Sequence, residues 1–347
     1  MQANVRKRCK TRSKWIILGM AGLLSLALSL TACAPAPAAP EPAEPAPAVE
    51  APTPTEPAQQ PSGRLDKIKV ATTVYPLAEF VKAVGKERVE VSSLIPPGAE
   101  PHEFTPTPQD RVTIEQSQLF VFVGAGFEPW ADRILPDLKI ATVQASTGLS
   151  LLPAIVGHEH EHGHEDEANE EHLFDPHILA DPVLVQEIVN NITQKLSEID
   201  PANTSFYQNN ATSYKLKLID LDNRFKAGLA SCKRRDFITS HAAFAYLAKR
   251  YNLTQIPIAG IFEEDPSPAK LAEIVELIKE KNINYIFMER LIGNPKLTET
   301  IAKETGAKTL VLNPPEDITT EDIENGRDYF SLMTENLENL RLALECQ

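Results

Sequence analysis

The chain has 347 residues, of which 24% are charged, and its formal net charge at pH 7 is −14. Six of the basic residues lie within the first 33, so the rest of the chain sets 28 basic residues against 48 acidic ones, a balance of −20. A surface with this excess of negative charge repels nucleic acid and suits a cationic ligand. The composition therefore argues against nucleic-acid binding and favours a cation.

Residues 1–33 predict a secretory signal. An apolar run, "WIILGMAGLLSLALSL", follows six basic residues and leads into "LTAC", which ends at Cys33. This order of segments is typical of signals that are removed after export. "LTAC" also resembles a bacterial lipobox, which implies that Cys33 receives lipid and tethers the protein to a membrane. The alternative is a transmembrane anchor, but sixteen apolar residues fall short of the ~20 that span a bilayer.

Residues 34–65 predict a tether without a packed structure. The segment is rich in proline, alanine and glutamate, and it contains almost nothing that could pack into a core. Proline fixes an extended backbone, and the glutamates repel one another. We therefore expect a disordered, semi-rigid spacer, with a reach of up to roughly 90 Å at ~3.1 Å per residue.

Residues 66–202 alternate between strand and helix signals. The β-branched and aromatic runs "IKVATTV", "VEVSSLI" and "LFVFVGAG" predict strands, and a helical spacing of apolar residues follows the first of them. The stretch "PQDRVTIEQSQ" predicts a helix between the second and third strands. Such alternation is typical of a parallel sheet covered by helices, so this part is predicted to be an N-terminal α/β lobe.

Residues 203–231 predict one long amphipathic helix. Apolar side chains recur at intervals of seven, four, three, four and four residues, at Tyr207, Tyr214, Leu218, Leu221, Phe225 and Leu229. This spacing places them on one face of a helix about 40 Å long. A stiff helix between two lobes leaves a cleft, and clefts between lobes are common ligand sites.

Residues 232–347 repeat the strand and helix pattern. The runs "DFITS", "QIPIAGI", "YIFME" and "TLVLN" predict strands, and each precedes a helical pattern. Ser267 and Pro268 are typical of the first residues of a helix. The sequence thus predicts an α/β protein of two parallel-sheet lobes joined by one long rigid helix, with its ligand site in the cleft between them.

Two cysteines remain for a disulfide. Cys9 would leave with the signal and Cys33 would carry lipid, so Cys232 and Cys346 are the candidates for a pair. Exported proteins keep disulfides because their environment is oxidising. The alternative is a pair of free buried thiols, which export disfavours.

Five of the eight histidines lie in the acidic segment "GHEHEHGHEDEANEEH", residues 157–172, which we call the His-rich loop. It has no apolar face, and its imidazoles alternate with carboxylates. Such tracts bind metals weakly in many geometries, which predicts a secondary, weak metal site. The alternative is a solvated loop without a specific role. The predicted weak ligands are His158, His160, His162, His164 and His172.

The other three histidines stand apart from one another. His102 follows the strand "VEVSSLI", His177 lies in "FDPHILADP", and His241 ends the strand "DFITS". Side chains at the carboxyl ends of parallel strands gather at one edge of a sheet, so these imidazoles from both halves can converge on one ion. Taken singly, each is also compatible with an ordinary hydrogen-bonded loop histidine or a helix cap.

A family resemblance favours convergence. The motifs "PHEFTPTPQD", "DPHILADP", "TSHAAFAYLAKRY", "PSPAKLAEIVELIKE", "IFME" and "ETGAK" stand in this order, and the chain resembles the metal-binding proteins of ABC-type zinc and manganese uptake systems, known as cluster A-I. It is most similar to the zinc branch, whose members also tend to carry a His-rich loop before "DPH". The resemblance implies a non-enzymatic, monomeric protein that holds a buried metal between two lobes and delivers it to a membrane ABC permease.

Carried over residue by residue, the resemblance identifies His102, His177 and His241 as metal ligands. Manganese-binding members usually have a carboxylate at the third position, whereas imidazole suits zinc, so zinc is the predicted metal. Many relatives place an aspartate where this chain has Asn313, and an amide oxygen is a weak zinc ligand. The fourth ligand is therefore predicted to be water or the carboxylate of Glu103 or Glu289.

Zinc uptake has competing functional interpretations. A zinc hydrolase would need a helical H-E-x-x-H pair or an open metal position with a general base, and "HEHEH" has no apolar helix around it. Uptake of manganese or another divalent metal, or service as a surface adhesin, remain alternatives. All these interpretations place the protein outside the cytoplasm, anchored by lipid to a bacterial membrane and facing the periplasm or the outer surface.

Overall fold

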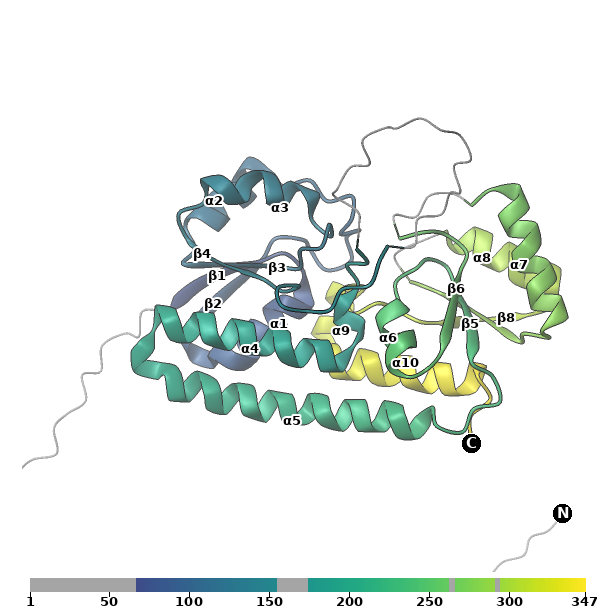
Figure 1. Cartoon of the computed structure of the whole chain (residues 1–347). Helices are drawn as coiled ribbons and strands as arrows, with labels where there is room; N and C mark the ends of the chain where they lie inside the picture. The colour runs from purple at the N-terminus through teal and green to yellow at the C-terminus, as the bar shows by residue number, and fades with distance from the viewer. Residues whose placement is uncertain (1–66, 155–173, 262–265, 291–293) are drawn as a thin grey trace, which may run out of the picture. The chain divides into compact units, whose positions relative to one another are not determined.

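The computed structural model describes residues 67–154, 174–261, 266–290 and 294–347 (Figure 1). Residues 63–347 form one compact unit. The predicted signal, Cys33, the tether and the His-rich loop lie outside the described residues, so the predictions for them remain predictions. Within the described ranges, no helix is both long enough and apolar enough to cross a membrane.

The first sheet has four parallel strands in the order β2-β1-β3-β4. Its strands are β1 (Ile68–Thr72), β2 (Val89–Ser93), β3 (Leu119–Phe122) and β4 (Ala141–Gln144). The helices along this part of the chain are α1 (Tyr75–Gly85), α2 (Pro108–Glu115) and α3 (Pro129–Ile134). Strand β1 lies in the middle, where Val70 pairs with Val91 on one side and Leu119 on the other. Three of these strands were predicted, and β4 was not.

The second sheet repeats this topology, in the order β6-β5-β7-β8 and again entirely parallel. Its strands are β5 (Asp236–Thr239), β6 (Thr254–Pro257), β7 (Tyr285–Met288) and β8 (Lys308–Val311). The helices here are α6 (Ala245–Arg250), α7 (Pro268–Glu280), α8 (Pro295–Thr305) and α9 (Thr320–Glu324). Ser267 caps α7 by accepting a hydrogen bond from the Lys270 amide, as predicted. The predicted α/β class with two parallel sheets is confirmed.

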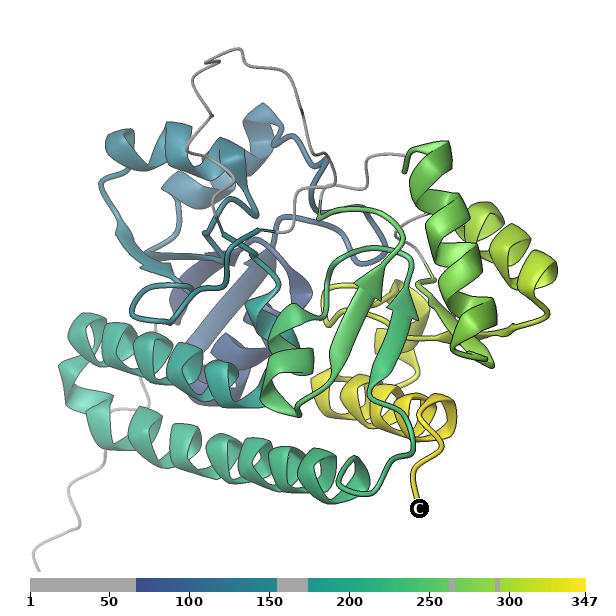
Figure 2. The same ribbon diagram turned by 45° about the vertical axis from the view of Figure 1, so that its right-hand side comes forward.

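Three long helices form a layer beside the sheets, namely α4 (Pro182–Ile199), α5 (Thr204–Gly228) and α10 (Tyr329–Ala343). Figures 1 and 2 show α4 and α5 lying side by side. The apolar positions predicted for the long helix are buried along α5 and at Leu229, just after its end. Helix α5 packs on α1 and α4 of the first half and also on α10 at the end of the chain.

Helix α10 returns from the second half to the first. The ring of Tyr329, its first residue, lies 5.4 Å from the ring of Phe80 on α1. The Tyr329 backbone amide donates to Glu79, which also accepts from the Tyr214 hydroxyl on α5. The largest apolar core accordingly includes side chains from both sheets and from all three long helices. The two sheets thus share one core.

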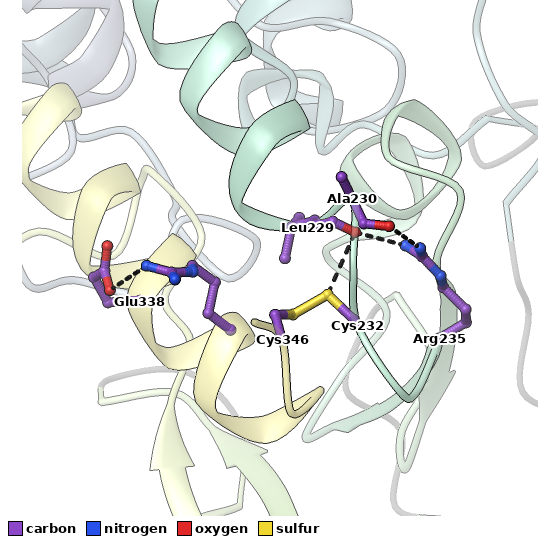
Figure 3. The surroundings of a disulfide bond; sticks show 7 residues. Leu229, Ala230, Cys232, Arg235, Glu338 and Cys346 are labelled. Carbon is purple, nitrogen blue, oxygen red and sulfur yellow. Dashed lines mark hydrogen bonds and ion pairs between the residues drawn. A yellow bond between two sulfur atoms is a disulfide. The ribbon is translucent and has the colours of Figure 1, made fainter.

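The predicted disulfide joins Cys232 to Cys346 (Figure 3). It links the segment that follows α5 to the segment that follows α10. The Arg235 guanidinium donates to the carbonyl oxygens of Leu229 and Ala230, which satisfies backbone acceptors at the end of α5. Because the cysteines are 114 residues apart in sequence, the bond removes much of the chain entropy of the unfolded state, by up to ~4.7 kcal/mol in the chain-entropy model.

Candidate metal site

The three isolated histidines come together in the folded chain. His102 lies in the connection that follows β2, His177 precedes α4, and His241 lies two residues beyond the last residue of β5. His177 and His241 are buried, and His102 is partly exposed. The site therefore draws on the carboxyl ends of strands from both sheets, which is where open α/β sheets bind ligands.

The imidazole rings face one another through their Nε2 atoms. Nε2 of His177 lies 3.3 Å from Nε2 of His102 and 3.4 Å from Nε2 of His241. The candidate ligand atoms of all three residues lie within 4.8 Å of one another. At such distances, nitrogen lone pairs that point at one another repel unless a proton or a metal cation lies between them. One cation in the centre satisfies all three nitrogens at once.

Buried carboxylates orient two of the three rings. The Nδ1 atom of His177 lies 2.9 Å from Asp175 Oδ1, which also accepts from the His177 backbone amide. The Nδ1 atom of His241 lies 2.7 Å from the Glu289 carboxylate, and the Ser240 hydroxyl donates to the same carboxylate. A carboxylate at Nδ1 keeps the proton on that nitrogen and leaves the Nε2 lone pair directed at the centre.

The aromatic ring of Phe127 lies beside His102. The ring of Phe127 lies 4.8 Å from the ring of His102 and 6.3 Å from that of His177. The preceding turn has positive φ angles at three successive residues, 76°, 56° and 82° at residues 124–126. Ala125 is the only one of the three with a side chain, and a non-glycine residue rarely adopts this conformation unless other contacts hold it.

Those contacts come from Glu128. Its buried carboxylate accepts hydrogen bonds from the Val123 and Gly124 amides, each at 2.9 Å, and from the Thr73 hydroxyl at 2.5 Å. Burial raises the pKa of Glu128 to about 7, and the three donors act against that rise. Glu128 thus fixes the turn that presents Phe127 to the histidines.

The candidates for a fourth ligand differ in their surroundings. Asn313 uses its side-chain oxygen to accept from the Arg290 amide at 3.1 Å. Glu103 is exposed, and Glu289 contacts His241 at the ring nitrogen that faces away from the centre. The side-chain oxygen of Asn313 and the carboxylate of Glu289 therefore already bond to the Arg290 amide and the His241 ring.

Glu316 is a buried carboxylate that the sequence reasoning missed. Burial raises its pKa, and the electrostatic influence of His177 and His241 opposes that rise. Its Oε2 atom has no hydrogen-bond partner among the described residues, although buried polar atoms usually have one. The available signal was the acidic pair that ends "VLNPPED", a stretch that begins at the last residue of β8.

Comparison with known protein families gives one match that spans most of the chain. The model described as "ZnuA: Zinc-uptake complex component A periplasmic" matches residues 70–343. The high-affinity zinc uptake system protein ZnuA of Bacillus subtilis (strain 168) is 39% identical over 283 residues, which cover 80% of this chain and 88% of that protein. The zinc-binding lipoprotein AdcA of Streptococcus pneumoniae (strain R6) is 38% identical over 279 residues. The aligned region is 55% of AdcA, so this chain spans about half of that relative.

Solved structures show the same fold. The Zn(II)-bound ZnuA-like domain of Streptococcus pneumoniae AdcA is 35% identical, with a TM-score of 0.69, and the match covers 80% of this chain and 99% of that domain. The laminin binding protein Lmb of Streptococcus agalactiae, described as having adhesin and metal transporting activity, is 32% identical, with a TM-score of 0.70. That match covers 80% of this chain and 99% of the Lmb chain.

Proposed function

The chain belongs to the ZnuA family of periplasmic zinc-uptake components, and from this premise we propose that it captures zinc outside the cytoplasm and delivers it to an ABC-type permease. The observation that carries the proposal is the spacing of the three Nε2 atoms. Zinc–nitrogen bonds of 2.0–2.1 Å in a tetrahedron place neighbouring ligand nitrogens about 3.3 Å apart. The two Nε2–Nε2 distances here are 3.3 and 3.4 Å.

The proposed ligands are His102, His177 and His241, with Glu316 as the fourth. Three imidazoles and one carboxylate suit zinc better than manganese, which prefers oxygen donors. We propose Glu316 in place of the water, Glu103 and Glu289 considered from sequence, because its carboxylate is buried, has an unpartnered oxygen and is influenced electrostatically by two of the histidines. A bound zinc ion would place a positive charge beside this buried carboxylate.

Two further roles extend the proposal to segments outside the described residues. Lipid on Cys33 would tether the protein to the membrane that holds its permease, and the tether of residues 34–65 would supply reach. The His-rich loop would bind zinc weakly and raise its local concentration near His177. Its deletion would therefore spare the tight site.

Handover to the permease would need only small movements. The three proposed histidines come from both halves of the chain, yet those halves share one apolar core, and α10 packs on α1. Wide hinge opening would expose this core to water. Shifts of the loops that carry His102 and His177 would break two coordination bonds without that cost.

The experiment that tests the proposal is a chelator-competition titration of the full-length protein in detergent with zinc and with manganese. The wild type, His241→Ala and a deletion of residues 157–172 form the set. Tight zinc binding that exceeds manganese binding, collapses in His241→Ala and survives the deletion is the expected result. Binding that survives His241→Ala and disappears with the deletion would overturn the proposal.

A surface adhesin is the second candidate, because the similar Lmb is described as having both activities. Adhesion does not need three converging histidines, which is why we place zinc capture first. A solid-phase assay with immobilised laminin distinguishes the two functions. Laminin binding that is unchanged in His241→Ala, together with no zinc binding in the wild type, would favour adhesion.

A further inference from the structure

Two short segments pair directly before His177 through an isolated β-bridge, and we call them the strand pair. The Asp175 backbone amide donates to the Leu152 carbonyl oxygen at 2.8 Å, and Pro153 and Phe174 form the antiparallel bridge. These residues flank positions 155–173, and the second segment continues without regular secondary structure through Asp175 to His177. The position of this pair therefore governs where the His177 ring lies.

The hydroxyl of Tyr246 extends this strand pair by one more connection. It accepts a hydrogen bond from the Leu152 amide at 3.0 Å and donates one to the Asp175 carbonyl oxygen at 2.7 Å. The phenol thus joins a donor on one strand to an acceptor on the other. Tyr246 is only 3% exposed, and burial raises its pKa, so the hydroxyl keeps its proton and can serve in both directions.

Tyr246 links the proposed ligands of the two halves. It lies on α6, five residues after His241, whereas one of the two segments it joins leads directly to His177. Asp175 is held at its carbonyl oxygen by Tyr246, and its carboxylate in turn holds Nδ1 of His177. A chain of hydrogen bonds therefore runs from the segment that carries His241 to the ring of His177.

We propose that Tyr246 is a positioning residue for metal capture: through its hydroxyl bridge to Leu152 and Asp175, it holds His177 opposite His241 before zinc arrives. The inference rests on the proposed function and adds a residue to it. Without the hydroxyl, the partly buried Leu152 amide and the buried Asp175 carbonyl oxygen lose this partner, and the strand pair loosens around Asp175. The His177 ring is then less well oriented in the metal-free protein. Part of the free energy of zinc binding must be used to orient it.

The expected effect is on the rate at which zinc leaves. Removing a group that orients a metal ligand typically weakens binding by about 10- to 100-fold. We expect Tyr246→Phe to speed zinc dissociation by roughly tenfold or more, because the ring and its packing are retained while the bridge is lost. The cobalt-substituted protein should also show altered visible absorption bands, since these report ligand geometry.

Tyr251→Phe is the matched control. Tyr251 is also buried, follows the same helix, and donates its hydroxyl to Asp222 on α5 at 3.3 Å, which lies outside the histidine cluster. Both variants remove one buried hydroxyl that bonds to a different part of the chain. Both are therefore expected to lower the melting temperature of the metal-free protein, but only Tyr246→Phe should change zinc dissociation or the cobalt spectrum.

The test uses full-length protein in detergent, loaded with zinc and mixed with excess chelator in a stopped-flow instrument. Faster dissociation in Tyr246→Phe than in Tyr251→Phe supports the inference. Equal dissociation rates in the wild type and both variants would overturn it and leave the proposed function standing. A wild type that binds no zinc would overturn the proposed function, and the inference with it.

A second measurement does not depend on the folding of any variant. In the metal-free wild type, amide hydrogen exchange at Leu152 should be as slow as in the core strands, because Tyr246 already holds that amide. Fast exchange at Leu152 in the folded, metal-free protein would show that the bridge forms only after zinc binds, and would overturn the inference.

Discussion

Glu128 should make the stability of the protein depend on pH near neutrality. Its pKa is about 7 in the folded state against 4.5 for an ordinary glutamate, because the carboxyl is buried. Between these two values the folded chain holds a proton that the unfolded chain has released. The free energy of unfolding therefore falls as the pH rises from 4.5 to 7, by about 1.4 kcal/mol per pH unit at most, and levels off above 7.

The substitution Glu128→Gln isolates this contribution. Glutamine stays neutral, so its cost or gain in hydrogen bonding to Val123 and Gly124 is the same at every pH. Subtracting the two stability curves removes the contributions of the other titrating groups. From pH 5 to pH 8 the difference between variant and wild type should shift by about 2.5 kcal/mol in favour of the variant.

Urea denaturation of the metal-free protein at half-unit steps of pH measures this difference. Thr73→Val provides a second check, since the Thr73 hydroxyl lowers the pKa of Glu128. Its loss should move the point at which stability levels off to a pH above 7. If the curves of the wild type and Glu128→Gln run parallel from pH 5 to pH 8, the reasoning from burial is refuted.

Three further outcomes follow from the site and the disulfide. Glu316→Gln should weaken zinc binding at least tenfold in chelator competition if the carboxylate is a ligand, whereas an unchanged affinity would return the fourth position to water. Asp175→Asn should weaken zinc binding by about 10- to 100-fold, because the amide no longer enforces the Nδ1 proton of His177; calorimetry that finds equal affinity would contradict the role given to Asp175. Reduction of the Cys232–Cys346 bond should lower the free energy of unfolding by about 2–4 kcal/mol. Urea denaturation with and without dithiothreitol measures this change. The stability of the double variant Cys232→Ser/Cys346→Ser should not respond to the reductant.

Periodicity was enough to predict the elements whose apolar residues stand at regular intervals. Helix α5 is an example, since its apolar positions are the buried ones. Helix α4 carried comparable signals, with Asp181 as its cap, Pro182 at its start and a regular apolar face, yet it was not predicted. Strand β4 is short and only partly buried, so its four residues give a weak pattern. These two missed elements thus differ in kind: the signals of α4 were overlooked, whereas those of β4 are weak in the sequence.

The metal site is harder to predict from local sequence patterns than the fold is. Family motifs surround the three histidines, which made it possible to predict His102, His177 and His241 as ligands. The distances of 3.3 and 3.4 Å between their Nε2 atoms, however, depend on how the two sheets are placed. Tyr246 carries no local mark of its surroundings in the sequence. It becomes noticeable only through its contacts with Leu152 and Asp175, which are more than 70 positions away.

The disulfide also determines how the molecule would respond to a pulling force. If the chain is stretched between its two ends, tension that reaches Cys232 passes through the sulfur bridge to Cys346, which is the residue before the C-terminus. The 114-residue span between them, roughly 400 Å of extended chain at about 3.5 Å per residue, carries no load. The backbone of the second sheet, whose first strand precedes His241, therefore bears no tension for as long as the disulfide remains oxidised.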